Sequence, residues 1–349
     1  MAYTTINKQT SHFNTLAYSG TGNSQALTGV GFQPDFTWIK RRNATNEHLL
    51  FDVIRGVTKA LNSNDATAED TISNSLTAFG TDGFTVEGNA SSGASGGTYA
   101  AWNWLAGGSA GSSNTAGSIN TTYTSVNTTA GFSISTYTGN GTSGATVGHG
   151  LGAVPEIIWV KALTGSNNWA CYHVSIGATK YFRLNENYAA ATSTARWNDT
   201  APTSSVFSIG NDGEVNTNGV PYVAYCWAPK IGFSKFGKYA SNNNIEGAFV
   251  YTGFKPNWII IKSIGSGGYN FMLFDSVRQP NNINGVTLQP DVTAAEFDYA
   301  PNGYVDFLSN GFKVRSTSNG VNGSGATEYS YMAFGQSLVG SNNVPCTAR

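Results

Sequence analysis

The sequence predicts an all-β protein built from three tandem antiparallel β-sandwich domains of the jelly-roll type. Three observations lead to this fold class: a composition rich in turn and strand residues, short runs that alternate as strands do, and a motif order that recurs three times. Glycine supplies 42 of the 349 residues and aromatic residues 13%, whereas only 11% are charged. Such a chain has enough apolar surface to fold, and Ser, Thr, Asn and Gly rather than charges cover its outside.

A strand that follows a proline marks each copy. In every copy a lysine stands six residues after this proline, at the end of an apolar and β-branched run: Pro34 and Lys40, Pro155 and Lys161, Pro256 and Lys262. The runs over residues 36–40, 156–161 and 257–262 are typical of buried strands. Their recurrence about every 100 residues indicates one module written three times.

Two further elements follow in the same order. An Asp-Gly or Asn-Gly turn leads into an alternating strand over residues 82–86 and 310–314, and residues 206–209 take this place in the second copy. Each copy then closes with an alternating aromatic strand, which begins at Tyr99, Tyr222 and Tyr331. Helix signals are scarce, so this order of strands predicts a sandwich.

The same markers set the domain boundaries. We predict a first sandwich with a short N-terminal arm, a Gly/Ser/Thr/Asn-rich flexible linker, second and third sandwiches, and a polar C-terminal tail. Their bounds are residues 1–106, 107–131, 132–229, 230–336 and 337–349. The join at residues 228–231 is too short for independent motion, so the second and third domains are expected to pack together.

Most tryptophans recur at fixed positions within the predicted strands and are expected to fill the sandwich cores. These are Trp38, Trp102, Trp104, Trp159, Trp227 and Trp258. Trp169 and Tyr269 lie instead in the hairpin that follows the lysine strand. They are our candidate ligand-binding residues, because an aromatic ring can stack on a sugar face, and packing between domains is the favoured alternative.

Acidic residues hold one recurring position. Asp52 and Asp275 occupy it in the first and third copies, whereas the second copy has His173. A pair of carboxylates is what a glycosidase needs, but Glu69 has no clear counterpart in the other copies. A turn-stabilising acid paired with Arg55 or Arg278 explains the position better.

Other motifs do not support chemistry. Residues 139–144 match a dinucleotide-binding glycine pattern, but the residues that follow would break the helix that it needs. Residues 107–111 match a nucleophile elbow, but they open the predicted linker and not a helix. No two of the four histidines, His12, His48, His149 and His173, are spaced as metal ligands, and Cys171, Cys226 and Cys346 form no metal-binding pattern. We therefore predict no catalytic, metal or cofactor site.

The motifs of the first copy resemble a domain found in virion proteins of marine tailed bacteriophages. They are Gly31-Phe32-x-Pro34-Asp35-x-x-Trp38-x-Lys40, then Asp52, Arg55 and Gly56, Leu61, Asp82-Gly83-Phe84, and Tyr99-x-x-Trp102-x-Trp104. The third copy keeps Asp275 and Arg278, and the second departs at His173. The resemblance covers most of the chain, implies lectin-like sandwiches of tail fibres or other virion structural proteins, and brings no catalytic residues with it.

The expected function is a structural protein of a phage tail or tail fibre that contacts glycans on the host surface. A capsid decoration or head-fibre protein is the alternative, and a polysaccharide-degrading enzyme is less favoured. The net charge of −1 excludes a polybasic nucleic-acid surface, and no apolar run is long enough to cross a membrane. With no basic, apolar leader at the start of the sequence, we expect assembly in the host cytoplasm into the virion, with other virion proteins and copies of this chain, a homotrimer by preference, as partners.

Overall fold

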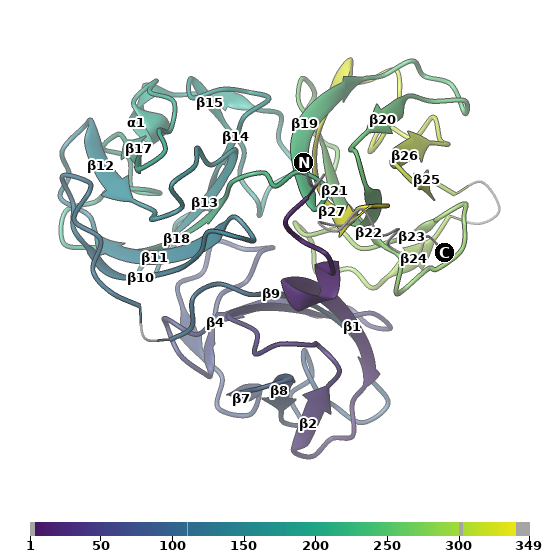
Figure 1. Cartoon of the computed structure of the whole chain (residues 1–349), viewed down its shortest axis with the longest axis horizontal. Coiled ribbons are helices and arrows are strands. Elements are labelled where there is room, and N and C mark those ends of the chain that lie inside the picture. The colour runs from purple at the N-terminus through teal and green to yellow at the C-terminus, as the bar shows by residue number, and fades with distance from the viewer. Residues whose placement is uncertain (1–3, 110, 300–302, 340–349) are drawn as a thin grey trace.

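The computed structural model describes residues 4–109, 111–299 and 303–339. Its chain is all-β, as predicted, and its strands form several antiparallel sheets. Figure 1 shows three lobes around a common centre, coloured purple to blue, teal and green to yellow in chain order. Each lobe corresponds to one sequence copy, which we call the first, second and third repeat.

The elements recur from repeat to repeat. The first repeat contains the 3-10 turn η1 (Gln9–Ser11) and strands β1 (Phe13–Ser19), β2 (Gln25–Thr28), β3 (Phe36–Arg41), β4 (His48–Asp52), β5 (Lys59–Ala60), β6 (Asp70–Thr71), β7 (Leu76–Gly80), β8 (Gly83–Val86) and β9 (Thr98–Trp104). The second contains β10 (Thr121–Asn127), β11 (Phe132–Thr138), β12 (Ala145–Gly148), β13 (Ile157–Ala162), β14 (Ala170–His173), β15 (Lys180–Tyr181), β16 (Ala191–Thr192), helix α1 (Thr194–Trp197), β17 (Val206–Ile209) and β18 (Pro221–Trp227). The third contains β19 (Ser234–Ala240), β20 (Phe249–Tyr251), β21 (Lys255–Ser263), β22 (Met272–Asp275), β23 (Val286–Thr287), β24 (Phe297–Asp298), β25 (Val305–Leu308), β26 (Gly311–Val314) and β27 (Glu328–Gln336).

One large sheet in each repeat has the same strand order. The orders are β1-β9-β3-β4, β11-β18-β13-β14 and β19-β27-β21-β22, so the closing strand always lies between the first strand and the lysine strand. A smaller sheet faces it, with orders β2-β8-β7, β12-β17 and β20-β26-β25. The apolar residues between the two sheets form a separate core in each repeat.

The Asp-Gly turn of the first repeat shows why its residues are needed. The exposed carboxylate of Asp82 accepts the backbone N–H groups of Gly29 (3.0 Å) and Gly31 (2.6 Å), and these bonds lower the pKa of Asp82. Gly83 has φ of 155°, and a Cβ there would lie 2.0 Å from the Leu27 carbonyl oxygen. The turn thus joins the small sheet to the loop before the lysine strand.

Two sequence expectations need correction. The predicted flexible linker, residues 107–131, contains β10, which pairs with β11 and adds a fifth strand to the large sheet of the second repeat. Hydroxyl-rich composition resembles that of a linker, but backbone pairing does not depend on it. The closing strand of the third repeat also begins at Glu328, three residues before the predicted start at Tyr331. Its counterpart of Tyr99 and Tyr222 is Tyr329, because Tyr329 is the residue that stacks on the tyrosine of the first strand.

The described N-terminal arm and the end of β27 meet at the joint between the first and third repeats. Gln9 of the N-terminal arm donates its N–H to the Gln336 side chain (2.7 Å) at the end of β27, and its side-chain oxygen accepts a hydrogen bond from the Asn257 amide of β21. Ile6 is buried in the apolar cluster at the centre of the molecule. The arm therefore fastens the third repeat to the first. Of the predicted tail, residues 340–349 with Cys346 lie outside the described residues.

Candidate functional site

The alternation of each closing strand divides its side chains between two cores. Tyr99 and Ala101 of β9 point into the first repeat's own core, whereas Trp102 and Trp104 point to a cluster at the centre of the molecule. Strands β18 and β27 divide their residues in the same way. Because neighbouring residues of a strand face opposite sides, these strands are buried on both faces.

All six recurring tryptophans belong to this central cluster. The prediction that they are buried is confirmed, but they fill the space between repeats and not the interiors of separate sandwiches. Trp104 contacts Trp258 of the third repeat (ring centroids 5.5 Å apart) and Trp227 of the second (6.3 Å), and Trp38 contacts Trp159 (5.9 Å). The three repeats therefore share one aromatic core, which packs them against one another.

Two of the three recurring lysines join neighbouring repeats. Lys40 Nζ donates to the Thr293 carbonyl of the third repeat (2.9 Å), and Lys161 Nζ donates to the Ala66 carbonyl of the first (3.0 Å). Lys262 Nζ donates to Tyr269 within its own repeat (2.5 Å). Burial lowers the pKa of each of these lysines to about 8. Their role is to satisfy loop carbonyls at the junctions.

The recurring acid position also bridges repeats. Asp52 accepts the hydroxyl of Tyr225 in the second repeat (2.6 Å), and Asp275 of the third repeat accepts the indole N–H of Trp102 in the first (3.0 Å). In the second repeat His173 Nε2 lies 3.1 Å from the Tyr331 carbonyl oxygen of the third. The three junctions are therefore closed by the same position of successive repeats.

A buried arginine completes two of these sites. Arg55 contacts Asp52 (2.6 Å) and Glu69 (3.2 Å), and Arg278 makes the equivalent contacts with Asp275 (2.5 Å) and Glu296 (2.9 Å). The predicted pairing of these acids with Arg55 and Arg278 is confirmed. Although burial opposes the charged form, the neighbouring acids raise the pKa of both arginines.

Glu69 does have a counterpart in the third repeat, which is Glu296. Glu69 N–H donates to Leu163 of the second repeat, and Glu296 N–H donates to Arg42 of the first, so both glutamates hold the same place at a junction. Glu296 also accepts two hydrogen bonds from Arg42 Nε and one from its Nη2. The loops before Glu69 and Glu296 differ in length and composition, which hides this correspondence in the sequence.

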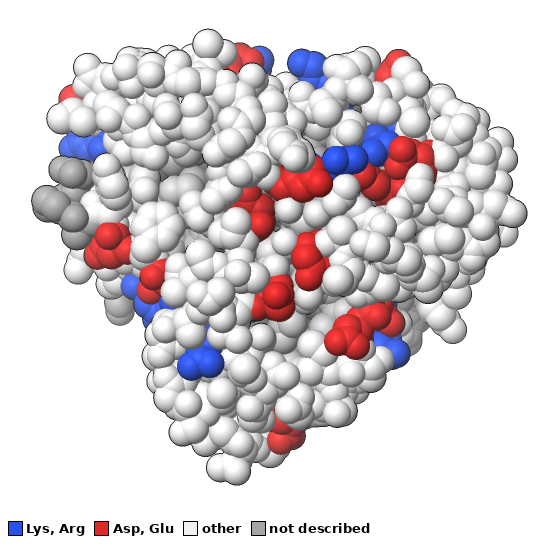
Figure 2. Space-filling view, turned by 180° about the vertical axis from the view of Figure 1, so that it is seen from behind, with Lys and Arg blue, Asp and Glu red and all other residues white. Residues whose placement is uncertain are grey.

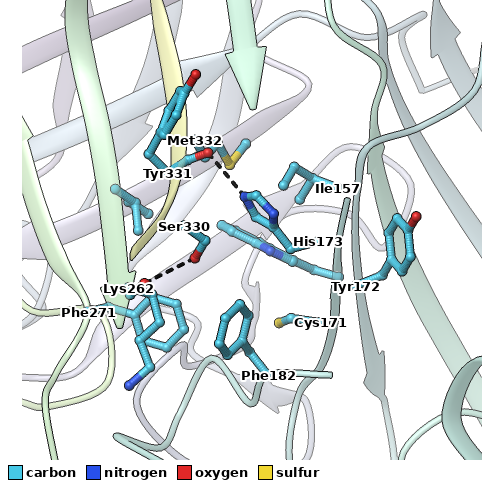
Figure 3. Close-up of a pocket in the computed structure, with 12 residues that line it drawn as sticks. Ile157, Cys171, Tyr172, His173, Phe182, Lys262, Phe271, Ser330, Tyr331 and Met332 are labelled. Atoms are coloured by element: carbon cyan, nitrogen blue, oxygen red, sulfur yellow. Dashed lines mark hydrogen bonds between the residues drawn. The ribbon is translucent and has the colours of Figure 1, made fainter. Parts of the chain in front are cut away.

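We call the sets Asp52, Arg55, Glu69 and Asp275, Arg278, Glu296 the Asp–Arg–Glu triads. The second repeat has other residues at all three positions. His173, Ile176 and Ala190 stand at these places, and Ile176 and Ala190 pack against the central cluster. A cavity of about 30 Å³, enough for one water molecule, lies here between the second and third repeats. Figure 3 shows His173 directed across it to the backbone of Tyr331, with Met332, Phe182 and Lys262 around it.

The groups around this cavity are not arranged for nucleophilic chemistry. Cys171 and His173 share one face of β14, but burial raises the pKa of the Cys171 thiol well above its usual value and lowers the pKa of His173 to about 4. A nucleophilic cysteine needs the thiolate. Among the described residues, no group of three or more His, Cys, Asp or Glu side chains is placed to hold a metal ion.

The two predicted ligand-binding residues differ in exposure. Trp169 is fully buried, and its indole N–H donates to the Asn62 carbonyl of the first repeat (2.8 Å). It therefore presents no face on which a sugar could stack. Trp169 packs between the second and first repeats, which is the alternative that we favoured from the sequence. Tyr269 is half-buried in the loop after β21, and ligand binding by this ring stays a prediction.

The surface carries little charge, and the acidic part of it is concentrated. Figure 2 shows a face that is mostly uncharged, with acidic side chains around its middle, where the three repeats meet. No helix in the described part of the chain is long and apolar enough to cross a membrane.

Comparison with known proteins identifies the family. A family model described as a domain of unknown function (DUF7483) matches residues 8–337. The chain belongs to this family. The match spans all three repeats, so the family's unit is the whole three-lobed body and not one repeat. No curated protein and no solved structure matches the chain.

Proposed function

We propose that this protein is a non-catalytic structural component of a bacteriophage tail or tail fibre, which also contacts host-surface glycans. The observation that carries the structural role is the shared aromatic core, because it packs the three repeats together. The assignment to a virion depends on the resemblance of the repeat motifs to virion proteins of marine tailed phages. Family membership adds no function to this argument.

We also propose that each repeat is a small sandwich of jelly-roll, lectin-like type. Its large sheet and its smaller sheet enclose an apolar core, which supports a sandwich. A mostly neutral surface suits glycan contact, because sugars are held through many hydroxyl and amide hydrogen bonds.

The expected homotrimer remains a proposal and needs a surface other than the large sheets. The inner faces of all three large sheets already meet within one chain. Copies of this chain would therefore associate through the outer loops or sheet edges.

An enzymatic role has less support. Asp52 and Asp275, the acids that would form a glycosidase pair, are both fully buried and each is bound to an arginine and to a neighbouring aromatic residue. A general acid must reach the glycosidic oxygen of its substrate. These carboxyl groups stabilise the junctions instead.

The location of the chain in purified particles tests the proposal. We expect antibodies against the chain to label intact virions at the tail. Labelling of capsid vertices or faces would favour the alternative, a decoration or head-fibre protein. Absence of the chain from purified virions that contain the other products of the same genome would contradict a virion role.

A further inference from the structure

A polar pocket of about 230 Å³ lies between the second and third repeats. One wall is the loop Asn185–Tyr188 of the second repeat, and the other is formed by residues of the third repeat. Its lining residues are Asn185, Glu186, Asn187, Tyr188, Asn270, Asp291 and Val292. The pocket thus combines carboxylate, amide and aromatic groups at a junction.

Asp291 is the unusual residue of this pocket. Its Oδ1 accepts the N–H of Phe271 (3.1 Å), whereas its Oδ2 has no hydrogen-bond partner among the described residues, and the residue is only 6% exposed. A buried carboxylate oxygen without a donor is unfavourable, because nothing replaces the hydrogen bonds that it would make to water. A structural role at the loop needs only Oδ1, so it does not explain the second oxygen.

In the other two repeats, the residue at the position of Asp291 has hydrogen-bond partners for both of its side-chain polar atoms. Asn64 and Asn185 stand at the equivalent places, and each accepts the equivalent backbone N–H, from His48 and from Trp169. In each, the amide nitrogen also has an acceptor: Asn64 Nδ2 donates to Glu47, and Asn185 Nδ2 donates to Asn168 (2.8 Å). Only the third repeat has an acid at this place.

The loop next to Asp291 is also altered. The equivalent of Glu47 and Asn168 is Asn270, whose amide donates away from Asp291 to Gln289 (3.0 Å). In the third repeat two residues, Tyr269 and Asn270, separate Gly268, whose N–H bonds across the junction, from Phe271, whose N–H donates to Asp291. The other two repeats have only one residue at this point of the loop. This extra residue moves the amide out of the place where it would close the pocket.

We propose that this pocket binds a neutral saccharide, with Asp291 accepting a sugar hydroxyl and the exposed ring of Tyr188 stacking on the sugar face. Hydroxyl groups donate to a carboxylate and accept from amides, and both kinds of group line the pocket. Tyr188 is 63% exposed, so its ring is open to a ligand. The proposal deepens the glycan-binding part of the proposed function and depends on it.

The charges around the pocket disfavour other ligand classes. None of the seven lining residues is basic, which leaves no cation to pair with a phosphate or an acidic sugar. A cationic ligand would gain little from the two carboxylates, because Asp291 already interacts electrostatically with Lys262, outside the pocket lining, and Glu186 is already paired with Arg183 (3.0 Å). An uncharged polyhydroxyl ligand depends on neither kind of charge pairing.

Saturation-transfer NMR with the full chain tests the site. The probes are glucose, galactose, mannose and N-acetylglucosamine, with glucuronate and glucosamine as charged comparisons. We expect at least one neutral sugar to bind, and expect binding to fall about tenfold or more in Asp291→Asn and in Tyr188→Ala. Asp291→Asn installs the residue found in the other two repeats, so the fold is expected to remain, and Tyr123→Ala, at an exposed tyrosine of β10, is the matched control.

The outcomes separate the site from the function. A neutral sugar that binds equally well to the wild type and both pocket variants would overturn this site and leave glycan binding standing. No binding of any neutral sugar would overturn both the site and the glycan-binding part of the proposed function. Binding of glucosamine or glucuronate alone would overturn the ligand class. Detection of the chain in virions is independent of all three results.

Discussion

The junction between the first and second repeats is closed by buried charges and directed hydrogen bonds, whereas the junction between the second and third is closed by apolar contacts and one histidine. At the first, Asp52 joins Arg55 to Tyr225. At the second, His173 lies within hydrogen-bond distance of a backbone carbonyl, and Ile176 replaces the arginine. Tyr225 and Trp102, which donate to the acid at the other two junctions, are replaced here by the apolar Met332. The second junction also contains the small cavity and the polar pocket.

In this chain the triad is either complete or wholly absent from a repeat. An isolated buried arginine or carboxylate is costly, so a repeat keeps all the ionic partners or none of them. His173, Ile176 and Ala190 make a neutral set, and the first repeat's Asp52, Arg55 and Glu69 make an ionic one. The neutral set is compatible with the fold but fills the space less completely.

The largest expected effect comes from breaking the ionic set. Arg55→Ala leaves the Asp52 carboxylate buried without its cation, and we expect the free energy of unfolding to fall by about 3–5 kcal/mol. Urea unfolding followed by tryptophan fluorescence measures this. The exposed pair of Lys238 and Glu328 provides the control, because Lys238→Ala is expected to cost less than about 1 kcal/mol. Equal losses in the two variants would contradict the role assigned to the triad.

Transfer of the neutral set sharpens the same test. The triple variant Asp52→His, Arg55→Ile, Glu69→Ala gives the first repeat the residues of the second. We expect it to be more stable than Arg55→Ala alone, because no charge is left unpaired. A triple variant less stable than the single one would show that the three positions are not exchanged as a unit.

The second effect is a pH dependence confined to the histidine junction. The pKa of His173 is lowered from 6.5 to about 4 by burial, so the unfolded chain binds a proton between these pH values and the folded chain does not. Stability is therefore lost as pH falls from 6.5 towards 4, by about 3 kcal/mol in all. Unfolding midpoints measured across this range should fall less steeply in His173→Gln than in the wild type.

The difference in pH dependence between the wild type and His173→Gln reports on His173 alone, although other groups also titrate. Burial also lowers the pKa of His48 well below its usual value, and it raises the pKa of Asp291 to about 7, which acts in the opposite direction. Both groups are unchanged in His173→Gln and cancel in the comparison. Identical slopes would show that His173 does not carry the acid sensitivity of this junction.

A third prediction compares equivalent backbone hydrogen bonds. Asn167 N–H donates to Ala66 at the first junction, and Gly268 N–H donates to Asn187 at the second. Because the second junction lacks the triad and contains a cavity, we expect the Gly268 amide to exchange with deuterium about tenfold faster, which corresponds to about 1.4 kcal/mol. Native-state hydrogen exchange measured by NMR checks this, and slower exchange at Gly268 would reverse the ranking of the junctions.

The smallest effect comes from filling the cavity. Met332→Phe adds volume beside His173, and filling about 30 Å³ is expected to stabilise the protein by roughly 0.7 kcal/mol. Thermal unfolding detects a change of this size as a small rise in Tm. A fall in Tm would show that the cavity walls do not admit the larger ring.

The sequence was sufficient for the repeats and for most of their strands, because proline, lysine and aromatic positions recur in order. It was not sufficient for the central cluster. Tyr99 and Trp102 occur in the same apolar strand, and periodicity places them on opposite faces without saying which face meets another repeat. The strand β10 was missed because its hydroxyl-rich sequence carries no apolar alternation.

Residues that act across repeats were the hardest to predict. Glu296 and Asp291 lie in loops whose lengths vary, and their partners are distant in the chain. Trp169 was placed correctly in a hairpin, but only the folded neighbour shows that Asn62 covers it. Contacts of this kind depend on how the lobes meet, which local sequence does not encode.

Because the three lobes are successive parts of one chain, each position in them is encoded separately. In a ring of three identical subunits, a substitution such as the acid at residue 291 would appear in every lobe at once. Here a mutation that opens one contact leaves the other two as supports. One lobe is thus free to change while its sisters keep the body together.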